Sequence, residues 1–176
     1  MPRILLAVVL TLLSAHAAAQ VGIAPKKPQE FLRFNPPPNW DVVNQQTSDV
    51  QRLVQLAPKG QKVEEWQELL TVHTYNLQSG RFPATVEGAM SALQEAIAKI
   101  CPGVKWNVIA RSGSSILYEW QVSGCQGTSD QHEITKLLEG STNRFRVAYT
   151  AKAKEMSNEQ RAEWLKSIAQ ATIVAQ

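Results

Sequence analysis

Histidine and aspartate are scarce in this 176-residue chain, and their scarcity argues against several kinds of site. Beyond the first twenty residues the only histidines are His73 and His132, and neither has a second histidine three or four positions away, as a zinc ligand pair requires. The chain has only three aspartates, so a calcium loop is not supported. No G-x-S-x-G nucleophile motif occurs, and the nearest fragment, residues 112–115, has the composition of a hairpin turn. We therefore expect no metal, no cofactor and no enzymatic activity.

Positive charge is also too dispersed to indicate a nucleic-acid-binding surface. The formal net charge of +3 falls to +2 once Arg3 is set aside, and the densest basic groups are Lys26-Lys27 and the pair Lys152 and Lys154. A protein that binds nucleic acid needs a basic stripe that neutralises several phosphates. We expect no nucleic-acid partner.

Long apolar runs are missing except near the start of the chain. Residues 4–13 are apolar apart from one threonine, follow Arg3, and precede the small residues Ala17-Ala18-Ala19. This order is typical of a secretory signal peptide, and a run of ten is short of the about 20 residues that span a bilayer. The sequence predicts a signal peptide over residues 1–19 with cleavage before Gln20. The mature protein is then periplasmic or secreted, without stable membrane insertion.

Cysteine occurs only twice, at Cys101 and Cys125. An even number of cysteines in an exported protein favours a disulfide bond. The bond would close a loop of about 25 residues. In the chain-entropy model, closing a loop of this length in the unfolded chain raises the unfolding free energy by roughly 3 kcal/mol. A redox pair would need close spacing such as C-x-x-C and a depressed thiol pKa, and a separation of 24 residues supports neither. We interpret the pair as structural.

The rest of the chain divides into an arm and one domain. Residues 20–37 form a proline-rich N-terminal arm that runs into the extended Pro36-Pro37-Pro38 segment. Residues 38–176 are long enough for a single domain with its own core, to which five tryptophans contribute.

Two helices are predicted from periodicity and capping. Residues 86–100 place apolar side chains on one helical face, with Thr85 as N-cap and Lys99 in the last turn. Residues 157–160 form a capping box, S-x-x-Q, that opens a helix ending near residue 170.

Alternating patterns predict antiparallel strands around these helices. Short strands precede the first helix, and two hairpins separate the helices; the predicted ranges are 40–45, 50–56, 69–75, 104–111, 116–122, 132–139 and 144–151. Runs of strands with segregated helices favour an α+β fold, an antiparallel β-sheet packed with two main helices.

Several stretches between Pro38 and Val174 resemble a set of small, uncharacterised exported bacterial proteins. The similar stretches are GQKVEEWQELLTV with Trp66 and Thr71, ICPG after the first helix, Tyr118-x-Trp120-(x)4-Cys125, HEITKLLEG, and Trp164-Leu165. The resemblance implies a PsbP-like α/β/α sandwich and supports the disulfide, but it implies no activity, because the shared motifs are structural. Members of the set often have a further cysteine near the C-terminal end. This chain ends in ATIVAQ, so no second disulfide is expected.

The densest titratable group is Asp130, His132 and Glu133. These side chains could hold a metal or act as an acid/base set in a small hydrolase. The alternative is that they form the polar exit of the loop after Cys125. Strand alternation would then place His132 and Glu133 on opposite faces of a sheet.

The aromatic residues are a better indication of function. Trp106, Tyr118 and Trp120 share one face of the predicted hairpin, which either packs in the core or forms a binding face. We predict a non-catalytic periplasmic binding or interaction module, for example an accessory subunit of an envelope complex, with another envelope protein as partner. The alternatives are an inhibitor or immunity-type protein against an exported toxin or enzyme, and the small hydrolase.

Overall fold

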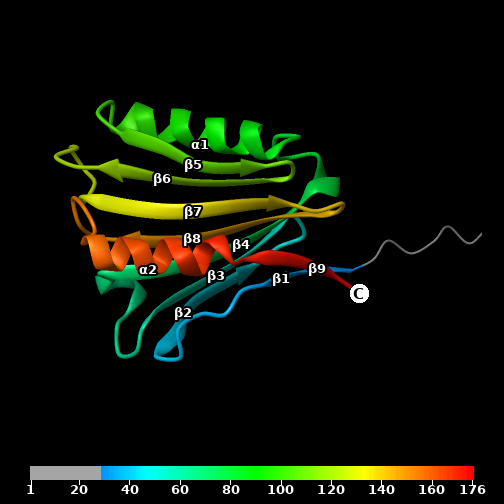
Figure 1. Ribbon diagram of the computed structural model, residues 1–176, viewed down its shortest axis with the longest axis horizontal. Helices are drawn as coiled ribbons and strands as arrows, with labels where there is room; N and C mark the ends of the chain where they lie inside the picture. Colours follow the sequence, from blue (N-terminus) through cyan, green and yellow to red (C-terminus); the bar gives the residue numbers. More distant parts are fainter. Residues whose placement is uncertain (1–28) are drawn as a thin grey trace, which may run out of the picture.

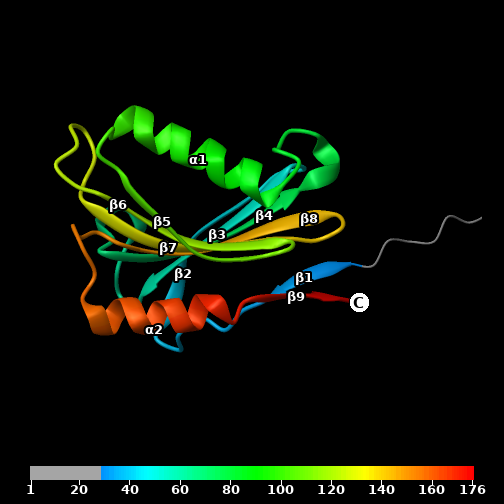
Figure 2. The same cartoon turned by 45° about the horizontal axis from the view of Figure 1, so that its top comes forward.

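The computed structural model describes residues 29–176; the predicted signal peptide, its cleavage point before Gln20 and the first part of the predicted arm lie outside this range. Seven antiparallel strands form the main sheet, in the order β2-β3-β4-β8-β7-β6-β5, and β1 pairs with β9 in a separate ribbon. Figure 1 shows the strands stacked side by side. Figure 2 shows helix α1 over one face of the sheet, with helix α2 and the ribbon on the other.

The predicted α+β fold with an antiparallel sheet and two main helices is confirmed, and the sheet is larger than the predicted hairpins alone. The strands are β1 (Glu30–Arg33), β2 (Trp40–Thr47), β3 (Gln51–Pro58), β4 (Glu68–Asn76), β5 (Lys105–Ser112), β6 (Ser115–Val122), β7 (Gln131–Glu139), β8 (Asn143–Ala151) and β9 (Thr172–Ala175). The helices are α1 (Val86–Ile100) and α2 (Asn158–Ala169), with short 3₁₀ turns η1 (Val63–Glu65) and η2 (Leu77–Ser79). Within residues 29–176, neither helix is both long and apolar enough to span a bilayer.

Helix α1 has the limits that its sequence predicted. The Thr85 hydroxyl accepts a hydrogen bond from the Gly88 amide, so the first turn is capped by the expected residue. Val86 and Met90 are buried against the sheet, whereas Ile100 at the last position is 65% exposed. The helix therefore rests on the sheet most firmly through its first two turns.

The sheet joins two meanders, β2-β3-β4 and β5-β6-β7-β8, through the pairing of β4 with β8. Nine consecutive residue pairs run from Glu68 opposite Ala151 to Asn76 opposite Asn143. The connection between the meanders contains α1, which crosses one face of the sheet (Figure 2). Strands β4 and β8, which are far apart in sequence, are therefore paired in the middle of the sheet.

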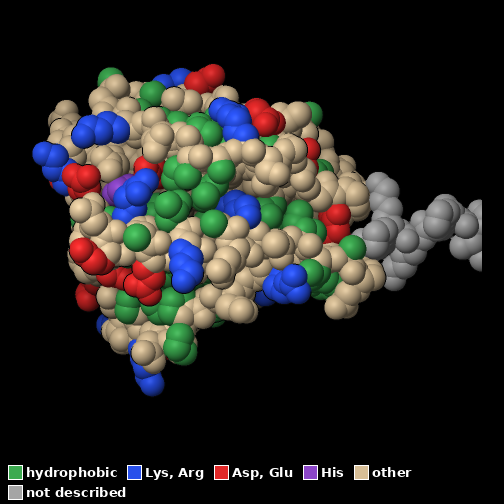
Figure 3. All heavy atoms as spheres, in the orientation of Figure 1, with side chains coloured by type: hydrophobic (Ala, Val, Ile, Leu, Met, Phe, Trp, Pro, Cys, Tyr) green, Lys and Arg blue, Asp and Glu red, His purple; other side chains and the backbone are tan. Residues whose placement is uncertain are grey.

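Alternation along these strands divides the core into two halves. On the α2 side, Trp164 and Ile168 pack against strand residues that include Leu70, Val147 and Tyr149. The indole of Trp164 stacks on the ring of Tyr149, with centroids 4.0 Å apart. The α1 side buries a second set of side chains: Val86, Met90, Ile116, Tyr118, Trp120, Val122 and Leu137. On the described part of the face in Figure 3, acidic and basic side chains are interspersed around apolar ones.

Part of the predicted arm is a strand, a feature that its sequence did not indicate. Residues 30–33 pair with residues 172–175, and Glu30 reaches the turn between β7 and β8. Its carboxylate accepts hydrogen bonds from the backbone amides of Ser141, Thr142 and Asn143 and from the Thr142 hydroxyl. Burial alone would raise the pKa of Glu30, but these hydrogen bonds lower it to about 2.

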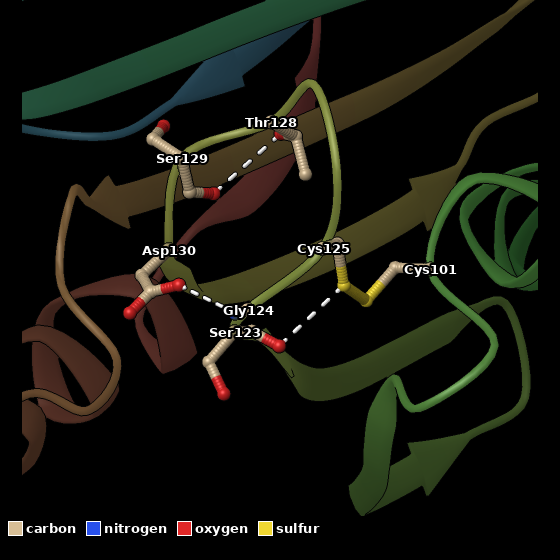
Figure 4. The surroundings of a disulfide bond; sticks show 7 residues. All are labelled: Cys101, Ser123, Gly124, Cys125, Thr128, Ser129 and Asp130. Atoms are coloured by element: carbon tan, nitrogen blue, oxygen red, sulfur yellow. Dashed lines mark hydrogen bonds between the residues drawn. A yellow bond between two sulfur atoms is a disulfide. The ribbon is translucent and has the colours of Figure 1, made fainter.

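The predicted disulfide between Cys101 and Cys125 is confirmed. Cys101 is the C-cap of α1, and Cys125 lies in the loop after β6, with the two Cα atoms 5.4 Å apart. Asp130 accepts a hydrogen bond from the Gly124 amide across the same loop (Figure 4). The disulfide therefore fixes the end of α1 to the open end of the hairpin β5-β6, just after β6.

We expect the double variant Cys101→Ala/Cys125→Ala to lose about 3 kcal/mol of unfolding free energy, because the bond restricts the unfolded chain. Urea unfolding of the oxidised wild type and of the variant measures the difference. Reductant should lower the wild-type midpoint and leave the variant unchanged. Equal midpoints for the oxidised wild type and the variant would contradict a stabilising role.

We expect Glu30→Gln to loosen the β1-β9 ribbon, since an amide replaces the charged acceptor of four hydrogen bonds. The pKa of Glu30 is lowered from 4.5 to about 2, so its contribution is complete above pH 4.5 and is lost as the pH falls toward 2. Hydrogen exchange of the ribbon amides, compared between variant and wild type at each pH, measures the effect. The matched control is Glu163→Gln on the exposed side of α2. An equal effect of both variants would refute the role of Glu30.

Candidate functional site

The three titratable residues singled out in the sequence do not come together. Asp130 is used in the loop, where it accepts the Gly124 amide at 2.8 Å. His132 and Glu133 are consecutive on β7 and bind groups on opposite faces of the sheet. Their arrangement gives no support to the small-hydrolase hypothesis.

His132 belongs to the contact between the sheet and α2. Its Nδ1 accepts a hydrogen bond from the Met156 amide at 3.0 Å, and its Nε2 lies 3.4 Å from Glu119. Glu119 in turn receives two hydrogen bonds of 2.7 Å from Arg161 on α2 and one from Asn107. Because the Met156 amide donates to Nδ1, that nitrogen is an acceptor that positions the start of α2, and burial lowers the pKa of His132, which favours the neutral imidazole.

Glu133 is the centre of a buried polar network on the α1 side. Its carboxylate is only 5% exposed and accepts four hydrogen bonds. The donors are Trp120 Nε1 at 2.9 Å, the Thr135 hydroxyl, an Arg146 NH₂ group at 2.6 Å and the Thr150 hydroxyl at 2.9 Å. A buried carboxylate needs such a complete set of partners, so Glu133 is a structural anchor for Arg146.

Beside this network lies a cavity of about 280 Å³ between α1 and the sheet, here named the α1 pocket. Its lining residues come from β4, the segment before α1, α1 itself, and strands β6 to β8: His73, Tyr75, Phe82, Pro83, Ala89, Ala92, Leu93, Tyr118, Leu137, Arg144 and Arg146. The volume is near the lower limit of about 300 Å³ for ligand pockets. The pocket therefore suits a small molecule.

Three polar atoms of the α1 pocket have no hydrogen-bond partner among residues 29–176. They are the Tyr118 hydroxyl, Nε of Arg146 and Nδ1 of His73, and all three are buried. More than about 90% of buried polar groups in proteins are paired, and an unpaired one costs about 1–3 kcal/mol. Three such atoms around one cavity are the arrangement expected where a bound molecule completes the hydrogen bonding.

The register of β4 against β8 places two of these residues together, since His73 is directly opposite Arg146. Burial, followed by the nearby charge of Arg146, lowers the pKa of His73 to about 4. Burial raises the pKa of Tyr118 and that of Tyr75. At neutral pH the pocket thus contains a neutral imidazole, two neutral phenols and the positively charged guanidinium groups of its arginines.

The predicted binding face of Trp106, Tyr118 and Trp120 lies beneath α1 and is not an open surface. Tyr118 is completely buried, Trp120 is 7% exposed, and the Trp106 ring stacks on Tyr118 with centroids 4.9 Å apart. Trp120 donates to the structural carboxylate of Glu133. Of these three residues, only Tyr118 lines the α1 pocket.

Sequence reasoning missed His73 and Arg146. A signal was present, because Arg144 and Arg146 alternate with the apolar Phe145 and Val147, which places both arginines on one face of a strand. The pattern does not reveal that this face lies under α1 or beside β4.

A larger cavity of about 430 Å³ lies on the other face of the sheet, between the ribbon and strands β3, β4 and β8. Its lining includes Phe31, Phe34, Val54, Leu70 and Phe145. Among the described residues, it contains no buried polar atom that lacks a partner. Its chemistry is therefore much less specific than that of the α1 pocket.

Within residues 29–176, no three His, Cys, Asp or Glu side chains gather closely enough to hold a metal ion. Models of known protein families give no match to the chain, and a search of curated proteins finds no similar sequence.

Acidification should destabilise the protein through His73. The pKa of His73 is lowered from 6.5 to about 4, so the folded state favours the neutral imidazole. The contribution of His73 to the unfolding free energy is therefore fully present above pH 6.5 and is lost as the pH falls toward 4. The wild type should lose unfolding free energy between pH 7 and pH 4, and we expect His73→Gln to lose about 1–2 kcal/mol less over the same range. Urea unfolding at several pH values measures it, and identical slopes in variant and wild type would contradict the burial of a neutral imidazole.

Proposed function

We propose that this chain is an exported, non-catalytic binding module that holds a small ligand in the α1 pocket. The observation that carries the proposal is the convergence of three unpaired, buried polar atoms from Tyr118, Arg146 and His73 on one cavity. These residues lie on β6, β8 and β4, so three strands of the sheet together form the polar end of the pocket.

The remaining walls are apolar, which gives the pocket the composition of a small-molecule site. Ala89 and Leu93 line it from α1, Leu137 from β7, and Phe82 from the segment before the helix. A ligand would rest its apolar part on these side chains and direct its polar group toward the sheet. The strands hold the polar residues at fixed positions, and preorganisation of this kind favours binding.

The charged groups support binding more than catalysis. Arg146 is committed to Glu133 by a hydrogen bond of 2.6 Å, and the pKa of His73 is about 4. A general base works best with a pKa near the operating pH, so this imidazole is a weak candidate at neutral pH. Both residues instead offer fixed hydrogen-bonding atoms.

The proposed location is the periplasm or the exterior of the cell. Residues 1–19 carry the pattern of a signal peptide, and a disulfide such as Cys101–Cys125 persists in oxidising compartments. Helices on opposite faces of an antiparallel sheet agree with the PsbP-like α/β/α sandwich that the sequence resemblance implies (Figure 2). By that analogy of fold, we propose that the module serves as an accessory subunit of an envelope complex.

Filling the pocket tests the proposal. Small aromatic and branched fragments, screened by NMR on the mature protein, should perturb the amides of His73, Leu93 and Arg146. Ala92→Trp, which places a large ring at the pocket wall, should weaken binding at least tenfold. The matched control is Ala96→Trp, one turn further along α1 and outside the lining, which should bind as wild type does. The proposal fails if no fragment perturbs these amides, or if both variants bind equally.

Tyr118→Phe distinguishes a ligand-binding hydroxyl from a structural one. The hydroxyl makes no hydrogen bond of standard geometry among residues 29–176, although Arg146 and Thr135 lie near it, so its removal should leave the unfolding free energy unchanged or raise it by up to about 1 kcal/mol. Fragment affinity should fall at the same time. Destabilisation of more than about 1 kcal/mol in urea unfolding would show that the hydroxyl supports the fold.

A further inference from the structure

We infer that the ligand of the α1 pocket is a small monoanion, a carboxylate attached to an apolar body. The inference rests on the proposed function, since it specifies the chemistry of a ligand in the same pocket.

The first argument is the sign of the charges on the pocket wall. Arg144 and Arg146 line the pocket, and its described lining contains no aspartate or glutamate. The carboxylates that pair with these arginines, Glu139 and Glu133, lie outside the lining. The lining therefore contributes two cationic side chains and no anionic one, so the potential at the pocket wall favours an acceptor with negative charge.

The second argument is the supply of donors. Nε of Arg146 is free of protein partners within residues 29–176, because the guanidinium reaches Glu133 through an NH₂ group instead. The Tyr118 hydroxyl lies near Arg146 and Thr135 but makes no hydrogen bond of standard geometry to either, so it is a second donor in the same pocket. Two donors suit the two oxygens of a carboxylate, and hydrogen bonds to an ionised acceptor are roughly twice as strong as those to a neutral one.

The third argument limits the charge to one. Arg144 and Arg146 are each already paired with a glutamate, so only part of the positive charge of each guanidinium is available to a ligand. A doubly charged group such as a phosphate monoester would be buried without sufficient countercharge, which is strongly unfavourable. A carboxylate carries one charge, so it can accept hydrogen bonds from Arg146 with a smaller desolvation penalty than a phosphate monoester.

The fourth argument is the shape of the remaining space. The pocket of about 280 Å³ is open to solvent on one side, and its remaining walls are mostly apolar, among them Leu93, Leu137 and Phe82. These walls disfavour highly hydroxylated molecules, because hydroxyl groups packed against them would lose their hydrogen bonds to water. An aromatic ring or a short branched chain next to the carboxylate fits this environment.

Matched probes test the inference by isothermal titration calorimetry at pH 7. The probes are phenylacetate, its uncharged amide phenylacetamide, and benzylphosphonate, with cyclohexanecarboxylate and its amide as a second pair. We expect each carboxylate to bind at least tenfold more tightly than its amide, and the phosphonate to bind more weakly than phenylacetate. Amides that bind as tightly as the acids would overturn the inference and leave the proposed function intact. If no probe binds and neutral fragments also fail to perturb the pocket, the proposed function fails with it.

Two variants locate the source of the preference. Arg146→Gln combined with Glu133→Gln removes both charges of the buried pair together and avoids leaving an unpaired charge behind. It should abolish the preference for acid over amide while amide binding persists. Tyr118→Phe is the milder test and should reduce phenylacetate affinity about three- to tenfold, with a smaller effect on the amide. An acid preference that survives in both variants would contradict the assignment of Arg146 and Tyr118 as the carboxylate donors.

Discussion

The pairing of β4 with β8 is the interaction on which the rest of the molecule depends. It joins two local meanders into one seven-stranded sheet, and α1, which lies in the connection between them, packs over β6 and β7 on one face of that sheet. Its register sets His73 opposite Arg146 and Tyr75 opposite Arg144. A slip of one residue would turn these side chains to the other face and bury them against the apolar α2 core, so the register is strongly specified.

The two faces of the sheet use buried charge differently. On the α2 side, Glu119, Arg161 and His132 form a contact that ties the helix to the strands. On the α1 side, Glu133 binds four donors and holds Arg146 in place, yet Nε of that arginine has no partner within residues 29–176. All acceptor positions used by Glu133 are filled, whereas Nε of Arg146 at the cavity is not, and a rigid, desolvated donor of this kind supports the proposed binding role.

The disulfide and the ribbon act at opposite ends of this architecture. Cys101–Cys125 restrains the exit of α1, whose last residue is largely exposed and adds little packing. Glu30 fixes the ribbon to the turn between β7 and β8 through hydrogen bonds to backbone amides. Both connections are long-range restraints that hold the covering elements against the sheet. The restraint on α1 also limits how far the roof of the α1 pocket can move.

The sequence by itself determined the local features: the limits of α1 and its Thr85 cap, the hairpins, the α+β class and the pairing of the cysteines. These depend on periodicity, capping and compartment, which neighbouring residues encode. Only the tertiary structure decided that β4 lies beside β8, that β1 is a strand, and that His73, Tyr118 and Arg146 share one cavity. Strand pairing between distant segments is selected by the packing of the whole sheet, and no local pattern records it.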